Sequence, residues 1–275
     1  MTVQQALKYA TLKLEAITDE PRSEAKIIVA HLGKTEPNRL PFFSGEILED
    51  ALDDILEKRL SRIPLQFILG KWWFYGLEFF VGEGVLIPRQ DTELLVETAL
   101  ELLRDKQGAE VCDLCSGSGC IAISLAKERQ DLDVTAVEKF DKAYGYLTHN
   151  ITHNDAKNVM PVKADVTLKS FGMYDLIVSN PPYIPVTDWE TLSPEVQKEP
   201  ETALLGGKDG LEFYRIITSV WKTALKSGGS LAFEVGINEA EAVAEILKAE
   251  NFSEITIRND LSGIQRVVFG TLKDI

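Results

Sequence analysis

From residue 91 onward the chain alternates short apolar runs with longer amphipathic segments. Strands that are connected through helices run parallel, and the helices then cover both faces of the sheet. The last two runs have no helix between them, so we expect an antiparallel hairpin through 259–263 at the sheet edge. The pattern predicts an α/β fold built on a seven-stranded sheet. We expect strands at 109–114, 132–137, 159–163, 174–179, 229–235, 253–259 and 264–271, and helices at 91–105, 119–128, 141–152, 210–226 and 238–250.

The N-terminal region, residues 1–72, shows a helical pattern instead. Apolar residues recur every three or four positions in three stretches, which predicts a small helical bundle. The bundle contains no cluster of catalytic residue types, so a scaffold or dimerisation role and a substrate-docking role both stay open. The apolar stripes are Val3, Ala6, Leu7, Ala10 and Leu14, then Ala25, Ile28, Val29 and Leu32, then Leu52, Ile55, Leu56 and Leu60.

An aromatic-rich segment follows a break at Pro64. The run 72–81 combines aromatic and branched residues, which is typical of a hairpin. We predict a β-hairpin linker there, with Trp72 and Trp73 packed in a core. The expected domains are therefore a helical domain at 1–72, the linker at 73–90 and the α/β domain at 91–275.

The composition is that of an acidic globular protein. The 275 residues carry a formal net charge of -14, and the sequence pI is near 4.8. Such a chain lacks the general electrostatic attraction that supplies most non-specific nucleic-acid affinity. No apolar stretch approaches the ~20 residues of a membrane span, and the N-terminus lacks the apolar core of a secretory signal. We expect a cytoplasmic monomer that binds neither nucleic acid nor membrane.

The cysteines and histidines do not indicate a metal site. Cys112, Cys115 and Cys120 crowd into one apolar run and the turn after it, and an odd number suits a reducing compartment. No fourth ligand accompanies them, so we interpret them as small buried residues. His149 and His153 are spaced to share a helix face but lack the glutamate of a zinc-protease motif, and we expect both at the surface.

A glycine-containing loop, 113–122, joins the first predicted strand to its helix. Glycines let the backbone approach a ligand, and a helix N-terminus offers unpaired N–H groups. Gly117 and Gly119, with Ala122, satisfy the dinucleotide fingerprint, and Glu138 lies 21 residues after Gly117, where it suits ribose hydroxyls. These features fit NAD and S-adenosylmethionine equally well.

Two further strand ends carry polar groups. Asp165, just past the third strand, can accept a hydrogen bond from an adenine amino group, with Val166 packed on the ring. Asn180 ends the fourth strand, at the carboxyl edge where open α/β sheets bind ligands. The glycine loop, Glu138, Asp165 and Asn180 therefore converge on one crevice.

The tetrapeptide Asn180-Pro181-Pro182-Tyr183 indicates the chemistry of that crevice. The Asn180 side-chain oxygen can accept a hydrogen bond, and consecutive prolines leave the Pro181 carbonyl as a second rigid acceptor. Two acceptors can hold one NH2 group, and the Tyr183 ring offers a face on which a planar group can stack. An NAD-dependent dehydrogenase leaves this motif without a role. The motif favours an enzyme that holds a planar nitrogen beside a methyl donor.

Together these segments resemble the PrmC or HemK family, the glutamine N5-methyltransferases that modify the Gly-Gly-Gln loop of peptide chain release factors. The resemblance covers nearly the whole chain. It implies a Rossmann-like class I methyltransferase sheet, S-adenosylmethionine as cofactor with S-adenosylhomocysteine as product, and a helical domain that docks the release factor. The matching segments are 64–70, 86–93, the glycine loop, 180–184, 199–211 and 260–263.

The resemblance also implies which residues form the site. Two departures from the family pattern, Cys115 for the first glycine of the loop and Gln90-Asp91 for Pro-Glu, remove no required functional group. The segment 199–211 either faces the substrate or caps the sheet. The expected catalytic residues are Asn180, Pro181, Pro182 and Tyr183, and the expected cofactor-binding residues are Asp113, Cys115, Ser116, Gly117, Ser118, Gly119, Glu138, Asp165, Val166 and Asn180.

For this function we expect Asn180 Oδ1 and the Pro181 carbonyl each to accept one N–H of the substrate glutamine amide. Positioning of this kind can contribute ~7–11 kcal/mol, so no dedicated base is required. The main alternative is an adenine-N6 methyltransferase, which carries similar motifs but needs a basic track that the sequence does not show. A catalytically silent scaffold would require an impaired glycine loop or acceptor motif, and both are intact.

Overall fold

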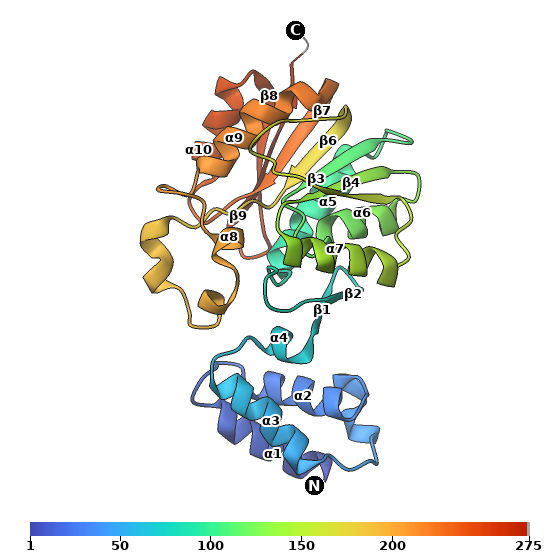
Figure 1. Ribbon diagram of the computed structural model, residues 1–275, viewed down its shortest axis with the longest axis vertical. Coiled ribbons are helices and arrows are strands. Elements are labelled where there is room, and N and C mark those ends of the chain that lie inside the picture. The colour runs from blue at the N-terminus through green and yellow to red at the C-terminus, as the bar shows by residue number, and fades with distance from the viewer. Residues whose placement is uncertain (274–275) are drawn as a thin grey trace. The chain divides into compact units, whose positions relative to one another are not determined.

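The computed structural model describes residues 1–273, which form two compact units (Figure 1). The helical unit comprises Met1–Lys71 together with Ser193–Lys198, and the α/β unit comprises Trp72–Leu192 and the chain from Glu199 onward. The predicted division after residue 72 lies beside this boundary. The short segment Ser193–Lys198, however, was expected in the larger domain and belongs with the helical unit instead.

Glu195 accounts for this difference. Its Oε1 accepts hydrogen bonds from Arg59 Nη1 at 2.9 Å and from Arg62 Nη1 at 3.0 Å. The Arg59 side chain is only 5% exposed and also forms a two-pronged pair with Glu24, at 2.8 and 3.1 Å. A buried guanidinium needs such partners, so Ser193–Lys198 completes the ion-pair network of the helical unit.

Three longer helices build the helical unit, and their apolar stripes form its core, as the periodicity predicts. Thr2 and Gln5 form a capping box at the first helix, and Pro21 opens the second. The prediction for Leu60 is wrong, because the stripe of the third helix continues to Arg59 and leaves Leu60 39% exposed. The elements are α1 (Val3–Leu14), α2 (Pro21–Leu32), the 3-10 helix η1 (Pro37–Phe42), α3 (Glu49–Leu60) and α4 (Leu65–Leu69).

The predicted hairpin is present, with β1 (Lys71–Phe74) and β2 (Leu77–Phe80) joined by a two-residue turn. Tyr75 and Gly76 both have positive φ, 49° and 73°, as such a turn requires. Trp72 is half-buried against Val81, Val85 and Ala143. Trp73 lies on the opposite face of the strand and is 60% exposed, so its prediction as a core residue is wrong.

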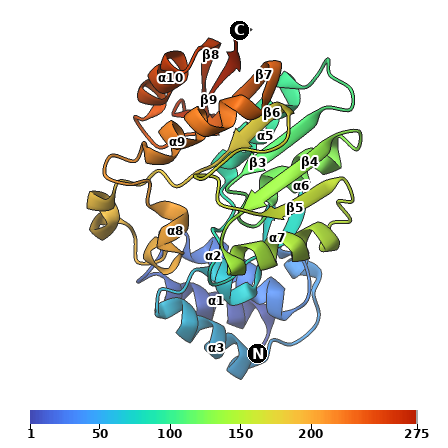
Figure 2. The same cartoon turned by 45° about the horizontal axis from the view of Figure 1, so that its top comes forward.

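A seven-stranded sheet forms the centre of the α/β unit, in the order β5-β4-β3-β6-β7-β9-β8 (Figure 2). All neighbours pair in parallel except β9, which runs antiparallel to both β7 and β8. The seven strands and the C-terminal hairpin at the sheet edge are confirmed. The strands are β3 (Glu110–Leu114), β4 (Asp133–Glu138), β5 (Val159–Lys163), β6 (Tyr174–Ser179), β7 (Leu225–Glu234), β8 (Phe252–Asn259) and β9 (Gln265–Leu272).

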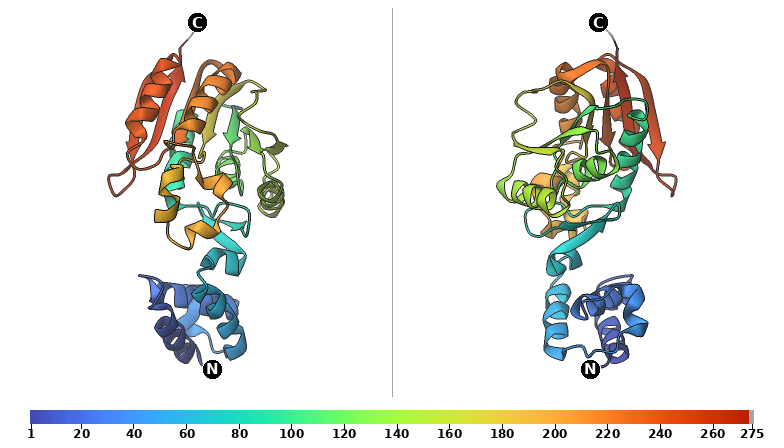
Figure 3. Two further views of the ribbon diagram at one scale, coloured as in Figure 1. Left: turned by 60° about the vertical axis from the view of Figure 1, so that its left-hand side comes forward. Right: turned by 90° about the vertical axis from the view of Figure 1, so that its right-hand side faces the viewer.

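Helices cover both faces of this sheet (Figure 3). They enclose two separate apolar cores. One face carries α5 (Glu93–Leu102), α6 (Cys120–Glu128) and α7 (Asp141–His153). The other carries α9 (Glu212–Trp221) and α10 (Ala240–Ala249). Within residues 1–273, no helix has the length and apolar character that crossing a bilayer would require.

The predicted helix at 210–226 is too long. It ends at Trp221, and after the 3-10 turn η5 (Lys222–Ala224) the strand β7 already begins at Leu225. Buried Trp221 donates from its indole Nε1 to the Val166 carbonyl at 2.8 Å, which anchors the helix end. The pairing of β7 with β6 shifts register between Tyr174 and Leu176. This irregularity makes the start of β7 hard to recognise in the sequence.

Candidate active site

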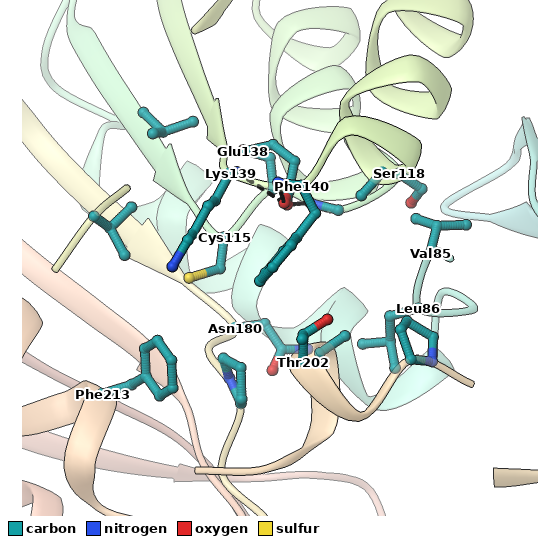
Figure 4. A pocket seen from close by; sticks show the side chains of 18 of the residues that line it. Val85, Leu86, Cys115, Ser118, Glu138, Lys139, Phe140, Asn180, Thr202 and Phe213 are labelled. Carbon is teal, nitrogen blue, oxygen red and sulfur yellow. Dashed lines mark hydrogen bonds between the residues drawn. The ribbon is translucent and has the colours of Figure 1, made fainter. Parts of the chain in front are cut away.

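A cavity of about 400 Å³ opens at the carboxyl ends of β3, β4, β5 and β6 (Figure 4). Most of the sequence-predicted residues line it. Asp113, Gly119, Pro181 and Tyr183 do not, and their places are described below. The predicted residues that line the cavity are Cys115, Ser116, Gly117, Ser118, Glu138, Asp165, Val166, Asn180 and Pro182.

The glycine loop between β3 and α6 is shaped by left-handed backbone at Cys115, Gly117 and Gly119. Gly119 lies against α7, since an added Cβ would lie 2.6 Å from Leu147 Cδ1. Asp113 lies buried beneath the loop, where its Oδ2 accepts from the Ala122 N–H at 3.2 Å. Asp113 therefore holds the first turn of α6, and burial raises its pKa to about 7.

Cys115 takes φ +60°, a left-handed backbone conformation that favours glycine. We expect Cys115→Gly to leave the free energy of unfolding within about 1 kcal/mol, because relief of strain offsets the greater freedom of glycine in the unfolded chain. Cys115→Val should lower it by about 2 kcal/mol, because a β-branched residue fits this backbone region poorly. Chemical denaturation of both variants checks this, and equal losses would refute the strain argument.

Glu138 ends β4 and holds the glycine loop and the following turn together. Its Oε2 accepts from the Gly117 N–H at 2.9 Å, and its Oε1 accepts from the backbone of Lys139 and Phe140, both at 2.8 Å. The residue is only 6% exposed, yet it lines the cavity. Oε2 can accept a further hydrogen bond, so Glu138 is able to hold a hydroxyl group of a ligand.

Asp165 follows β5 and faces the same space. Burial would raise its pKa, but hydrogen bonds from Lys139 and Thr167 lower it to about 2. The Lys139 ammonium lies 2.8 Å from its Oδ2, and Thr167 donates from its backbone and hydroxyl to Oδ1 at 2.9 and 2.6 Å. Asp165 is therefore ionised, and Val166 packs beneath it in the core under α9.

Lys139 and Phe140 are cavity residues that the sequence analysis missed. Figure 4 shows the Phe140 ring pointing into the cavity from the Glu138 side. The Lys139 ammonium lies 5.4 Å from the centre of this ring. The sequence does contain a signal for them, because both residues directly follow Glu138, the acidic residue at the end of β4. Side chains just past a strand end lie at the edge of the sheet where ligands bind.

Asn180 directly follows β6 and reaches the cavity beside Thr92. Its Nδ2 donates to Thr92 Oγ1 at 3.3 Å, and neighbouring Ser179 anchors the strand end by donating to the Leu114 carbonyl at 2.8 Å. Pro181 is buried in the turn. Tyr183 is half-buried outside the cavity lining, with its ring against Gly236 and the core under α9, and burial raises its pKa.

The segment 199–211 does two things at once. Its backbone pairs with the chain after the tetrapeptide, since the Ile184 N–H donates to the Leu204 carbonyl at 2.8 Å and the Gly206 N–H donates to the Ile184 carbonyl at 2.9 Å. Pro200, Thr202 and other residues around α8 (Glu201–Leu204) line the cavity. The segment therefore both forms a wall of the cavity and fixes the Asn-Pro-Pro-Tyr turn.

Glu199 ties this wall to the segment before α5. The carboxylate is buried, accepts from the Ile87 N–H at 3.0 Å and pairs with Arg89. This pair could not be predicted from the sequence, because Arg89 and Glu199 lie 110 positions apart.

The remaining expectations concern cysteines and histidines. Cys112 and Cys120 are buried, as predicted, whereas Cys115 is half-buried. His149 and His153 are exposed on α7, as predicted, with their rings against the Phe80 ring. Among residues 1–273, no group of three or more His, Cys, Asp or Glu side chains could hold a metal ion.

Comparison with known proteins finds matches over nearly the whole chain. Residues 5–70 match the model of the PrmC N-terminal domain, and residues 90–192 match that of the methyltransferase small domain. A release factor glutamine methyltransferase of Clostridium acetobutylicum is 36% identical over 280 aligned positions, covering 98% of both chains. The chain belongs to the release factor glutamine methyltransferase family. A second member, from Fusobacterium nucleatum, is 41% identical over 256 positions, covering 90% of this chain and 72% of the relative.

Solved structures support the fold of this family member. The catalytic domain of hMettl16, in complex with the MAT2A 3'UTR hairpin 6, superimposes with a TM-score of 0.61, covering 73% of this chain and 77% of that chain. The two sequences are only 17% identical. The likeness therefore establishes a shared methyltransferase-type α/β fold and carries no information about the substrate.

Proposed function

We propose that this chain transfers a methyl group from S-adenosylmethionine to the side-chain amide nitrogen of the glutamine in the Gly-Gly-Gln motif of peptide chain release factors. The observation that carries this proposal is the position of Asn180. Its amide nitrogen is engaged by Thr92 while the side chain borders the cavity at the end of β6. An acceptor oxygen is thus left for a planar NH2 group next to the glycine loop.

The residues around the cavity fit the proposed cofactor. Glu138 offers Oε2 to a ribose hydroxyl, and Asp165 offers an acceptor to the adenine amino group with Val166 beside it. The glycine loop allows the close approach that a sulfonium side chain requires, with Cys115, Ser116, Gly117 and Ser118 forming that wall. Asp113 and Gly119 then act indirectly, by holding the loop and α6 in place.

In the proposed reaction the bound cofactor supplies an electrophilic methyl group on sulfur. An amide nitrogen is a poor nucleophile because its lone pair is delocalised into the carbonyl. Asn180 Oδ1 and the Pro181 carbonyl would each accept one N–H and aim the nitrogen at the methyl carbon. The new N–C bond would form as the C–S bond breaks, the sulfur of S-adenosylhomocysteine would keep that electron pair, and the nitrogen would then lose one proton to solvent water. Pro182 borders the amide, while Tyr183 fixes the turn rather than stacking on the substrate.

The helical unit is proposed to dock the release factor, as the resemblance implies, and the protein is proposed to act as a monomer in the cytoplasm. Relatives named for release factor methylation match across both units, which supports a shared substrate.

The test is to incubate the purified protein with methyl-labelled S-adenosylmethionine and either unmodified release factor or adenine-containing nucleic acid. Mass spectrometry of the products then locates the label. Label on the Gly-Gly-Gln glutamine is expected. Label on adenine alone would replace the proposed substrate, and tight cofactor binding without transfer to either would indicate a binding scaffold.

Cofactor affinity provides a second check. Glu138→Ala should weaken S-adenosylmethionine binding by about tenfold, because the variant loses the ribose acceptor and the hydrogen bonds that hold Gly117. Glu128→Ala, at the exposed end of α6, is the matched control and should bind normally. Isothermal titration with both variants distinguishes them, and equal affinities would remove Glu138 from the site.

A further inference from the structure

A buried glutamate lies behind Asn180. Glu234 ends β7, the strand next to β6, and the pairing of Ser179 with Phe233 brings Asn180 and Glu234 side by side. Glu234 is 2% exposed and is not among the residues that line the cavity. An ionised carboxylate in this position is costly unless hydrogen-bond donors or a positive charge compensate it.

Two polar side chains of the site lie next to this carboxylate. Asn180 Nδ2 donates to Thr92 Oγ1 at 3.3 Å, and hydrogen bonding by Thr92 and Asn180 lowers the pKa of Glu234 against the effect of burial. Thr92 is itself 2% exposed, so water cannot easily replace either partner. Glu234 Oε2 has no hydrogen-bond partner within residues 1–273, which leaves the carboxylate ready to accept further donors.

This arrangement decides which way the Asn180 amide faces. An asparagine amide carries donors on one side and an acceptor on the other, and a half-turn exchanges them. With the half-turn, Oδ1 would lie against the Glu234 carboxylate and the Thr92 oxygen, which is electrostatically unfavourable. A buried carboxylate therefore selects the orientation in which Nδ2 faces inward and Oδ1 faces the cavity.

We infer that Glu234 is a positioning residue that, together with Thr92, locks the Asn180 amide so that Oδ1 is presented to the substrate nitrogen. The inference rests on the proposed function and adds a residue that acts through Asn180 without touching the substrate. A carboxylate that accepts from the amide nitrogen also makes Oδ1 a stronger acceptor, because hydrogen bonds in a chain polarise one another. That oxygen faces the positive charge that develops on the amide nitrogen during methyl transfer.

The charge of Glu234 depends on its surroundings. Burial raises its pKa to about 7, against the opposing effects of the Thr92 hydrogen bond, Arg266 and Asn180, while Asp91 adds to the rise. Arg266 itself lies 2.8 Å from Asp91.

The other groups that face Glu234 are tyrosines and a thiol. The Tyr214 hydroxyl donates to the Glu234 carbonyl at 3.1 Å, and Tyr183 and Cys120 are also within its field. Burial raises the pKa of each of these three groups, so none of them titrates near neutral pH. Protonated Glu234 becomes a donor and no longer selects the productive amide orientation, so turnover should rise with pH through about 7.

The experiment compares Glu234→Gln with wild type. The neutral glutamine also carries donors, so kcat should fall about tenfold, the effect of one positioning hydrogen bond, and its pH dependence near 7 should disappear. The dissociation constant for S-adenosylmethionine should not change. Thr92→Val should show a similar loss, Thr92→Ser should restore activity, and the double variant Glu234→Gln/Thr92→Val should be no worse than either single variant.

Glu239→Gln is the matched control. Burial also raises the pKa of Glu239 to about 7, but this carboxylate accepts from the Gly236 N–H at 3.0 Å and from Tyr214, not from Asn180. The rise of turnover with pH near 7 should therefore persist in Glu239→Gln. Normal kcat in Glu234→Gln, or loss of this pH dependence in Glu239→Gln alone, would overturn the inference.

A measurement without turnover separates this inference from the proposed function. In 15N spectra, the side-chain NH2 signal of Asn180, assigned by its loss in Asn180→Ala, should shift with pH near 7 in wild type and stay constant in Glu234→Gln. An NH2 signal that titrates identically in both proteins would refute the lock whatever the substrate is. Absence of methyl transfer by the wild type, with the titration intact, would instead refute only the proposed function.

Discussion

Asn180→Ala should lower turnover by on the order of a hundredfold or more, the usual cost of losing one preorganised transition-state contact. The variant removes Oδ1, which borders the cavity, and also the amide that donates to Thr92. The Pro181 carbonyl alone then holds the substrate nitrogen, and a nitrogen held at one point rotates away from the methyl group. Single-turnover methylation of release factor is the appropriate measurement, because it isolates the chemical step.

The matched control is Asn259→Ala, an exposed asparagine at the end of β8. This variant should retain full turnover. Cofactor affinity of Asn180→Ala should fall much less than turnover, because Glu138, Asp165 and the glycine loop are untouched. Near-normal turnover of Asn180→Ala would remove this residue from the mechanism, whereas a parallel loss of cofactor binding would indicate a collapsed cavity.

Gly206→Ala should abolish the precise placement of the Asn-Pro-Pro-Tyr turn. An added Cβ would lie 2.6 Å from the Pro182 carbonyl, the Tyr183 Cα and the Gly210 carbonyl, all of them backbone atoms that cannot rotate away. The strain should lower the free energy of unfolding by about 3 kcal/mol. Turnover should fall on the order of a hundredfold, since a displacement of ~1 Å at a reacting centre has this effect.

Gly145→Ala, in the middle of α7, is the corresponding control. No atom lies within 4 Å of its added Cβ, so alanine should stabilise the helix by about 0.5–1 kcal/mol without changing turnover. Thermal denaturation and methyl-transfer assays on both variants provide the comparison. Wild-type activity in Gly206→Ala would show that the wall formed by 199–211 does not position the turn.

The parts of the site that follow strands in sequence order could be predicted. Glu138, Asp165 and Asn180 each stand at the end of an apolar run, and parallel strands bring such ends to one edge. The glycine loop could be predicted for the same reason. Tyr183 shows the limit of this reasoning, because a ring next to a binding residue in sequence can point into the core behind it.

Residues that act through tertiary pairing could not be predicted. Glu234 looks like the polar end of any buried strand until its neighbour is known to be Asn180 rather than solvent. Arg59 looks like a surface residue of α3 until Glu24 and Glu195 supply its partners. Trp73 shows the reverse error, because aromatic content alone does not reveal which face of a short hairpin is covered.

The contacts of Glu199 have a consequence for the order of folding. The carboxylate joins residues 112 and 110 positions away, Ile87 and Arg89, so this link closes one of the long loops of the chain. Loop closure of this length costs entropy before any contact repays it, and we expect the link to form late. A ligand that needs this wall can bind only the completed α/β unit. A higher cofactor concentration would then protect newly made chains from proteolysis. Cofactor binding shifts the equilibrium from partly folded chains to folded ones.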